Sequence, residues 1–189
     1  MNPNNGTLLP TGSAWIDAPE TFAGSVVNVA RSPYDGSHTN PAPNEPISDS
    51  WATYNYFSVG PESANYTNNP AILGFDKSKT SFSFLWGSVD DYNLIEFWDS
   101  VGLVFTLDFE DPALDGNVQL GIGAALVTVS DLIFNSIRFH SSTNALEFAN
   151  MRATPAPIPP ALLLFGTALV GLGYLARRRR QSTGPALAA

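Results

Sequence analysis

The sequence contains no cysteine, which excludes disulfide scaffolds, thiolate metal sites and cysteine nucleophiles. It contains only two histidines, His38 and His140, so a histidine-rich metal site is excluded as well. Charged residues make up only 14% of the 189 residues, which is about half the usual share. With 44% of the residues apolar, this composition is unlike that of an ordinary cytosolic enzyme.

Basic residues are scarce in most of the chain. The first 152 residues hold all 17 acidic residues but only five of the nine basic ones, so their net charge is −12. The other four basic residues stand together, as Arg177, Arg178, Arg179 and Arg180. A nucleic-acid partner is excluded for the acidic part, because it holds too few cations to neutralise phosphates.

One long apolar run is present, and it lies near the C-terminus. The 20 residues Pro157–Ala176 contain no charge and end directly before the four arginines. As a helix this run would be about 30 Å long, which matches the hydrocarbon core of a bilayer. We therefore predict a transmembrane helix whose arginines stay in the cytoplasm and leave the acidic part outside. The alternative is a buried core helix, which seldom abuts four consecutive arginines.

The same region resembles a known sorting signal. Pro157-Ile158-Pro159 stands before the apolar run, and the four arginines follow it. This order resembles the PEP-CTERM signal of bacterial surface proteins, in the variant that has Leu or Ile in place of Glu, as Ile158 does here. The resemblance implies recognition by exosortase, a membrane-embedded protease that cleaves near the Pro-x-Pro motif. It covers residues 156–180, and it departs from most such signals in the nine residues that follow the arginines.

Two blocks of the acidic part resemble one group of exosortase-dependent surface proteins. The first runs from Ser83 to Asn93 and continues through Ile95-Glu96-Phe97, and the second runs from Ile137 to Asn150. In that group the position of Ala149 is usually Asp, so if the Asp holds a structural metal, that ligand is missing here. The resemblance implies a location at the cell surface and no particular activity.

The N-terminus lacks the export signal that a surface protein needs. Met1–Pro10 has no basic region, and its longest apolar run is Leu8-Leu9. We expect the true start to lie upstream; the alternatives are a fragment and a wrongly assigned gene product. With an upstream signal, the expected path leads through an inner-membrane precursor to the cell surface or the extracellular matrix.

Most of the acidic part consists of short β-type runs divided by turn residues. The predicted strands are Ser25–Arg31, Tyr54–Val59, Ala71–Asp76, Ser81–Trp86, Asn93–Trp98, Val101–Phe109, Leu126–Val129, Leu132–His140 and Ala145–Met151. Their period is two: Phe82, Phe84 and Trp86 share one face, and Ser81 and Ser83 lie on the opposite face. A second apolar face is expected from Val101, Leu103, Phe105, Leu107 and Phe109. We predict an all-β fold, an antiparallel β-sandwich with jelly-roll-like topology; an immunoglobulin-like sandwich is the runner-up.

The predicted division of the chain follows its composition. Residues 1–50 are rich in Pro, Asn, Gly and Ser, and we expect 1–24 to be irregular. The β-sandwich is predicted over 25–152, and a short linker over 153–157. The sorting signal is predicted over 158–181, and a tail over 182–189.

The acidic part offers little for catalysis. No Gly-x-Ser-x-Gly nucleophile elbow occurs, and neither histidine stands in a recognisable triad. Asp90 and Asp91 stand at a predicted turn, where Asp bonds to the local backbone. Glu96 and Asp99 are three residues apart, so they face opposite sides of a strand. We therefore expect no enzyme, and a glycoside hydrolase with paired carboxylates is the weaker alternative.

An oxygen-rich turn at residues 108–117 is the candidate metal site. It carries four carboxylates, those of Asp108, Glu110, Asp111 and Asp115. Calcium prefers such oxygen ligands and is bound weakly by extracellular modules, although the spacing is not that of an EF-hand. A solvated acidic loop is the simpler interpretation, so no cofactor is expected and calcium stays an alternative.

Several aromatic residues lie outside the clearest core faces and have the amphipathic shape that stacks on sugars: Trp15, Trp51, Trp98, Tyr56 and Tyr92. We expect most of them to pack in the core or at its rim. The predicted function is that of a non-catalytic structural or adhesive surface protein. Its expected partners are exosortase, the membrane and an exopolysaccharide matrix. The alternative is a glycan-binding module, with or without calcium, or a hydrolase built on one.

Overall fold

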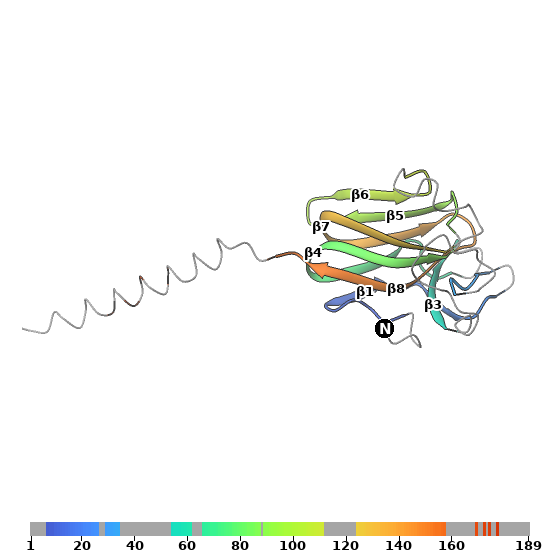
Figure 1. Cartoon of the computed structure of the whole chain (residues 1–189), viewed down its shortest axis with the longest axis horizontal. Coiled ribbons are helices and arrows are strands. Elements are labelled where there is room, and N and C mark those ends of the chain that lie inside the picture. Colours follow the sequence, from blue (N-terminus) through green and yellow to red (C-terminus); the bar gives the residue numbers. More distant parts are fainter. Residues whose placement is uncertain are drawn as a thin grey trace, which may run out of the picture. The chain divides into compact units, whose positions relative to one another are not determined.

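The computed structural model describes residues 7–26, 29–34, 54–61, 66–87, 89–111 and 124–157. Further along it describes four single residues, Leu169, Leu172, Tyr174 and Arg177. The chain divides into two compact units, Met1–Ala156 and Pro157–Ala189. The first unit carries all the strands that the structure describes, and it is shown with its labels in Figure 1.

The first unit is an all-β domain in which every strand pairing is antiparallel. Its strands are β1 (Ser13–Asp17), β2 (Glu20–Ala23), β3 (Asn55–Val59), β4 (Ala71–Gly87), β5 (Asn93–Trp98), β6 (Leu103–Asp108), β7 (Ala125–Ser141) and β8 (Leu146–Pro155). The all-β, antiparallel prediction is therefore confirmed. The predicted boundaries of β5 are those of the structure, and β3, β6 and β8 are found where they were expected.

Strands β4 and β7 are the centre of the domain. Each is 17 residues long, and they pair with one another along most of their length. Figure 1 shows them lying side by side through the middle of the first unit. The strand order is β2-β3-β8-β4-β7-β5-β6, with β1 pairing to β4 as well. All strands thus belong to one continuous hydrogen-bonded sheet.

An irregularity in the β4–β7 pairing divides that sheet into two halves. The register shifts between Gly74 and Ser81 of β4, on either side of Lys79. Before the shift β4 pairs with β1, and after it β4 pairs with β8 on that same edge. β7 pairs with β5 only through its C-terminal part, from residue 136 to residue 141. One half therefore contains β1, β5 and β6, and the other contains β2, β3 and β8.

The two halves pack their aromatic faces against each other. The ring of Phe139 on β7 stacks on Phe148 of β8, with 4.2 Å between centroids and 5° between planes. Trp15 of β1 lies edge-on to Phe57 of β3 at 5.1 Å, and Phe97 of β5 lies 6.2 Å from Phe82 of β4. Because strands from both halves supply these rings, the sheet folds over its own core in the manner of a β-sandwich.

The predicted core face of β4 is confirmed. Phe82, Phe84 and Trp86 are fully buried, whereas Ser81 and Ser83 on the opposite face are not. The predicted face of β6 is confirmed only at its C-terminal end. Leu107 is 2% exposed, whereas Val101, which precedes the strand, is 92% exposed and lies in a turn.

Three predictions about local structure are wrong. Residues 1–24 are not all irregular, since β1 and β2 lie there and pair with β4 and β3. In the segment predicted as the strand Ser25–Arg31, the described residues form only an isolated bridge between Val26 and Ala30. The predicted linker 153–157 is strand as far as Pro155, because its residues pair with β4 beyond the predicted sandwich boundary at 152.

Two further pairs of predicted strands are single strands in the structure. Ala71–Asp76 and Ser81–Trp86 are both parts of β4, and Leu126–Val129 and Leu132–His140 are both parts of β7. The polar residues between the predicted strands fall at the irregularity, where β4 and β7 bend and remain hydrogen-bonded. Turn-type residues in this position mark a bend and not the end of a strand.

Little of the second unit is described. Its four described residues beyond Pro157, namely Leu169, Leu172, Tyr174 and Arg177, have helical backbone. Among the described residues, no helix has the length and apolarity needed to cross a membrane. The predicted span Pro157–Ala176 lies largely outside the described residues.

The stacked ring of Phe139 gives a direct test of the core. We expect Phe139→Ala to lower the free energy of unfolding by about 3–5 kcal/mol, because a fully buried ring that contacts both halves is replaced by a cavity. Val101→Ala is the control, since Val101 is 92% exposed and should change stability by less than about 0.5 kcal/mol. Equal effects of the two substitutions in denaturant titrations would contradict the packing described.

Candidate functional site

The outer surfaces of the two halves differ in what covers them. Over β3 and β8, a second core cluster contains Tyr34, Tyr56 and Tyr66 together with Ala30 and Ala149. The hydroxyl of Tyr56 donates to Gly24 O at 3.0 Å, and that of Tyr66 donates to Val29 O at 3.1 Å. Burial raises the pKa of Tyr66 to about 12. Residues of the N-terminal segment therefore cover this face, and these tyrosines serve packing.

The outer face of β5 and β7 presents polar and aromatic side chains. On β5, Glu96 and Trp98 are two residues apart, and on β7 so are Arg138 and His140, so each pair shares a face. In the register Glu96 is opposite Arg138, and Leu94 is opposite His140. All four polar or aromatic side chains are half-buried. We call Glu96, Trp98, Arg138 and His140 the outer-face cluster.

Glu96 is the hub of the outer-face cluster. Its Oε2 accepts a hydrogen bond from Trp98 Nε1 at 3.0 Å and lies 3.1 Å from His140 Nε2. The carboxylate side chain is 17% exposed, and the imidazole is 29% exposed. The two contacts fix the indole and the imidazole in place on either side of the carboxylate.

Arg138 lies on the indole ring. Its guanidinium carbon is 4.0 Å from the ring centroid of Trp98, within the range of a cation–π contact. Its Nε is buried and has no hydrogen-bond partner among the described residues. The cluster thus brings a cation, an anion, an imidazole and an indole onto two neighbouring central strands.

The outer-face cluster has two of the three parts of a nucleophilic triad. Glu96 and His140 form the carboxylate–imidazole pair, but no serine or threonine hydroxyl of the described residues hydrogen-bonds to His140. The chemistry that the described groups support is therefore hydrogen bonding and stacking. Sequence reasoning named Glu96, Trp98 and His140 separately and missed Arg138; alternation along each strand was the signal that could have grouped them.

The other candidate carboxylates stabilise turns. Asp90 is 9% exposed and accepts a hydrogen bond from the Tyr92 hydroxyl at 2.7 Å. Burial raises the pKa of this carboxyl group, and the Tyr92 hydrogen bond partly offsets the shift. Asp99 accepts from the backbone N–H groups of Gly102 and Val101, which lowers its pKa. Asp90 lies directly before the turn at residues 91 and 92, as expected, but its side chain contacts the Tyr92 hydroxyl and not the local backbone as predicted. Asp99 has its own partners, separate from those of Glu96.

The acidic turn is only partly described. Asp108 is the last residue of β6, and Glu110 and Asp111 follow it in a turn closed by the Asp111 N–H to Asp108 O bond at 3.3 Å. Asp115 lies outside the described residues. The described residues contain no group of three acidic or histidine side chains that could hold a metal ion. Calcium binding by the complete turn stays a prediction.

The predicted sorting residues are mostly outside the described part. Pro157 is exposed, and it follows the last paired strand by two residues. Ile158 and Pro159 are not described. Of the basic cluster only Arg177 is described, as a helical residue, and Arg178, Arg179 and Arg180 are not.

The four described aromatic candidates lie in three places: the core, its rim and the outer-face cluster. Trp15 packs edge-on against Phe57, and Tyr56 is fully buried, so both belong to the core as expected. Tyr92 hydrogen-bonds to Asp90 at the rim. Trp98 lies in the outer-face cluster, and Trp51 lies outside the described residues.

Comparison with known proteins adds no assignment. No family model, no curated protein and no solved structure matches the chain. The function must therefore be argued from the chain's own residues.

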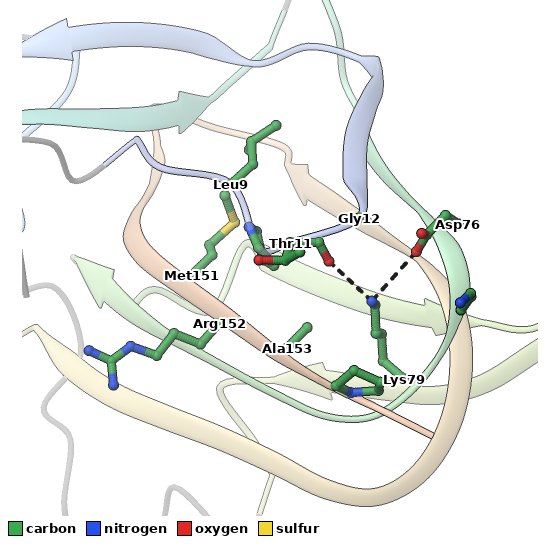
Figure 2. A pocket seen from close by; sticks show the side chains of 11 residues that line it. Leu9, Thr11, Gly12, Asp76, Lys79, Met151, Arg152 and Ala153 are labelled. Atoms are coloured by element: carbon green, nitrogen blue, oxygen red, sulfur yellow. Dashed lines mark hydrogen bonds and ion pairs between the residues drawn. The ribbon is translucent and has the colours of Figure 1, made fainter. Parts of the chain in front are cut away.

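A cleft of about 670 Å³ lies where the N-terminal segment crosses β8 and the bend of β4 (Figure 2). Lys79 extends into it from the bend with only 3% exposure. Its Nζ donates to Thr11 O at 3.2 Å and lies 3.7 Å from Asp76 Oδ1. Figure 2 shows the guanidinium of Arg152 pointing away from Lys79. The cleft's basic groups do not converge, and Lys79 instead attaches residues 9–12 to the bend.

Gly12 is required for that attachment. Its φ is +72°, and a Cβ built on it would overlap the carboxylate of Asp76. Its carbonyl oxygen accepts from the backbone N–H of Asp76 at 2.9 Å. Glycine adopts this left-handed φ without strain, whereas a side chain here would be strained and would have to displace the Asp76 carboxylate.

We expect Gly12→Ala to lower the free energy of unfolding by about 1–2 kcal/mol, because Ala is strained at positive φ. Gly102→Ala is the matched control, since nothing lies within 4 Å of a Cβ built there, and it should cost less than about 0.5 kcal/mol. Denaturant titration of both variants measures the difference. A Gly12→Ala protein as stable as the parent would mean that residues 9–12 are not held against β4.

Proposed function

We propose that the chain is an exported surface or matrix protein with a non-catalytic structural or adhesive role. Exosortase sorts and cleaves it at Pro157-Ile158-Pro159. The observation that carries this proposal is the place of the motif relative to the fold. The last strand, β8, ends at Pro155, and the compact unit ends at Ala156. A cut in the motif therefore leaves all eight described strands together in the N-terminal product, whether it is released or re-anchored.

The C-terminal unit supplies the membrane step of the proposal. Pro157–Ala176 is uncharged and long enough, as a helix, to cross the hydrocarbon core. Arg177–Arg180 hold the end of the chain in the cytoplasm, because each charge costs roughly 2.5–3.5 kcal/mol at the bilayer centre. The precursor is then a single-pass inner-membrane protein with the β-domain outside.

The β-domain is suited to an adhesive role. We assign it a jelly-roll-like sandwich topology, an architecture common among glycan-binding modules. The outer-face cluster supports the alternative function, binding of a glycan, more than it supports hydrolysis. The described residues give His140 no nucleophilic hydroxyl, and they give Glu96 no second carboxylate as a hydrogen-bond partner.

The sorting proposal is tested by the size and location of the protein in cells. The full chain, fused to a working export signal, should yield a shorter species that lacks the arginines in cells with exosortase. Cells without exosortase should keep the full-length precursor in the membrane fraction. Replacing Pro157 and Pro159 with Ala should block the shortening, because the protease would no longer recognise its motif. Blotting against an N-terminal tag measures both.

Replacing Arg177, Arg178, Arg179 and Arg180 with Ala is the companion variant. It should impair membrane retention with or without exosortase, because the stop to translocation is lost. If the protein has the same gel mobility in cells with and without exosortase, the sorting proposal is wrong and the C-terminal segment serves only as a membrane anchor.

A further inference from the structure

We propose that the outer-face cluster on β5 and β7 is a binding subsite for a neutral hexose unit of a polysaccharide. This deepens the adhesive role proposed above and rests on it for its setting at the cell surface. The binding itself is a property of the folded β-domain and does not depend on sorting.

The stacking surface in this proposal is the face of the Trp98 indole opposite Arg138, because the guanidinium already covers the other face. A pyranose ring has a C–H face that packs against an aromatic ring, and Trp offers the largest such surface. The hydrogen bond from Nε1 to Glu96 at 3.0 Å and the Arg138 guanidinium 4.0 Å from the centroid hold the ring in one orientation. A stacking surface that is already immobile loses little conformational entropy when a ligand binds.

The groups around the indole match the hydroxyls of a sugar. Glu96 uses Oε2 for both of its contacts in the cluster, which leaves Oε1 as an acceptor. His140 uses Nε2, which leaves Nδ1, and the guanidinium of Arg138 adds N–H donors. An acceptor, an imidazole and several donors within one cluster suit a ligand whose hydroxyls both donate and accept.

Charge favours a neutral sugar over an acidic one. The cluster contains one carboxylate and one guanidinium, so its own charges cancel when His140 is neutral. The surrounding part of the chain, residues 1–152, carries a net charge of −12. The electrostatic field of this negative charge would repel a polyanionic glycan but would not repel a neutral one.

The location of the outer-face cluster on the sheet suits the binding of a long polymer. The cluster lies on central strands of its half, since β5 pairs with β6 on one side and β7 on the other. The described residues place a second packed layer over β3 and β8 but none over these four side chains, which stay half-buried. A sheet face offers a polysaccharide chain room to continue on both sides of the bound unit.

The test is affinity electrophoresis of the purified full chain in native gels that contain a soluble polysaccharide. The neutral probes are dextran, galactomannan and xyloglucan, and the acidic probe is alginate. We expect at least one neutral probe to retard the protein and alginate not to retard it. Trp98→Ala should weaken the retardation at least about tenfold. Arg152→Gln is the control, since it removes one positive charge outside the cluster and should leave the retardation unchanged.

Two milder variants keep the test valid if Trp98→Ala unfolds. Trp98→Phe keeps a six-membered aromatic ring but removes the five-membered part of the indole with its Nε1 hydrogen bond to Glu96. Glu96→Gln keeps the shape of the side chain. Both should keep the thermal transition of the parent and weaken retardation. Retardation that survives Glu96→Gln and Trp98→Phe undiminished overturns the proposal, as does no retardation by any neutral probe or a preference for alginate. None of these outcomes bears on the exosortase blot, so the two proposals fail separately.

Discussion

The pairing of β4 with β7 is the constraint on which the rest of the domain depends. Each strand is 17 residues long, and the pairing continues on both sides of the irregularity around Lys79. Backbone groups buried in a sheet must be hydrogen-bonded, so strands that contribute to both halves fix how those halves meet. The stack of Phe139 on Phe148 is one result, because β7 supplies the first ring and β8, paired to β4, supplies the second.

The β4–β7 pairing also determines which side chains lie together on the outer face of β5 and β7. From residue 136 onward β7 pairs with β5 on one edge while it still pairs with β4 on the other, so its outward side chains stand beside those of β5. Arg138 is thereby placed opposite Glu96, and it lies over Trp98 two residues further along β5. A shift of one residue in this register would turn all these side chains towards the core. The hydrophobic inner face of β7, with Ile137 and Phe139 buried, therefore specifies the polar outer face.

Many of the strands could be predicted from the alternation of apolar and polar residues alone. The remaining features depend on contacts between residues that are distant in the sequence. The alternation of Phe82, Phe84 and Trp86 with other residues identifies the buried face of β4 from the local sequence alone. The predicted boundaries of β5 are also those observed. β1 was missed because it is five residues long and is stabilised by pairing with β4, some 60 positions away in the register of Ser13 with Phe75. The contact of Glu96 with His140 spans 44 residues. Alternation along each strand predicts that Glu96 lies on one face of β5 and His140 on one face of β7. Only the register between β5 and β7 brings the two side chains together.

Amide hydrogen exchange of the native protein, resolved along β4 and β7, measures whether these two strands join the halves of the domain into one cooperative unit. If these strands bind the two halves into one cooperative unit, the slowest amides of Ala71–Gly87 and Ala125–Ser141 exchange through one global opening. Amides on both sides of Lys79 then have the same opening free energy and the same dependence on denaturant. If the amides on one side of Lys79 exchange through a smaller opening while the others stay protected, the two halves fold independently. That result would contradict the central role of the β4–β7 pair.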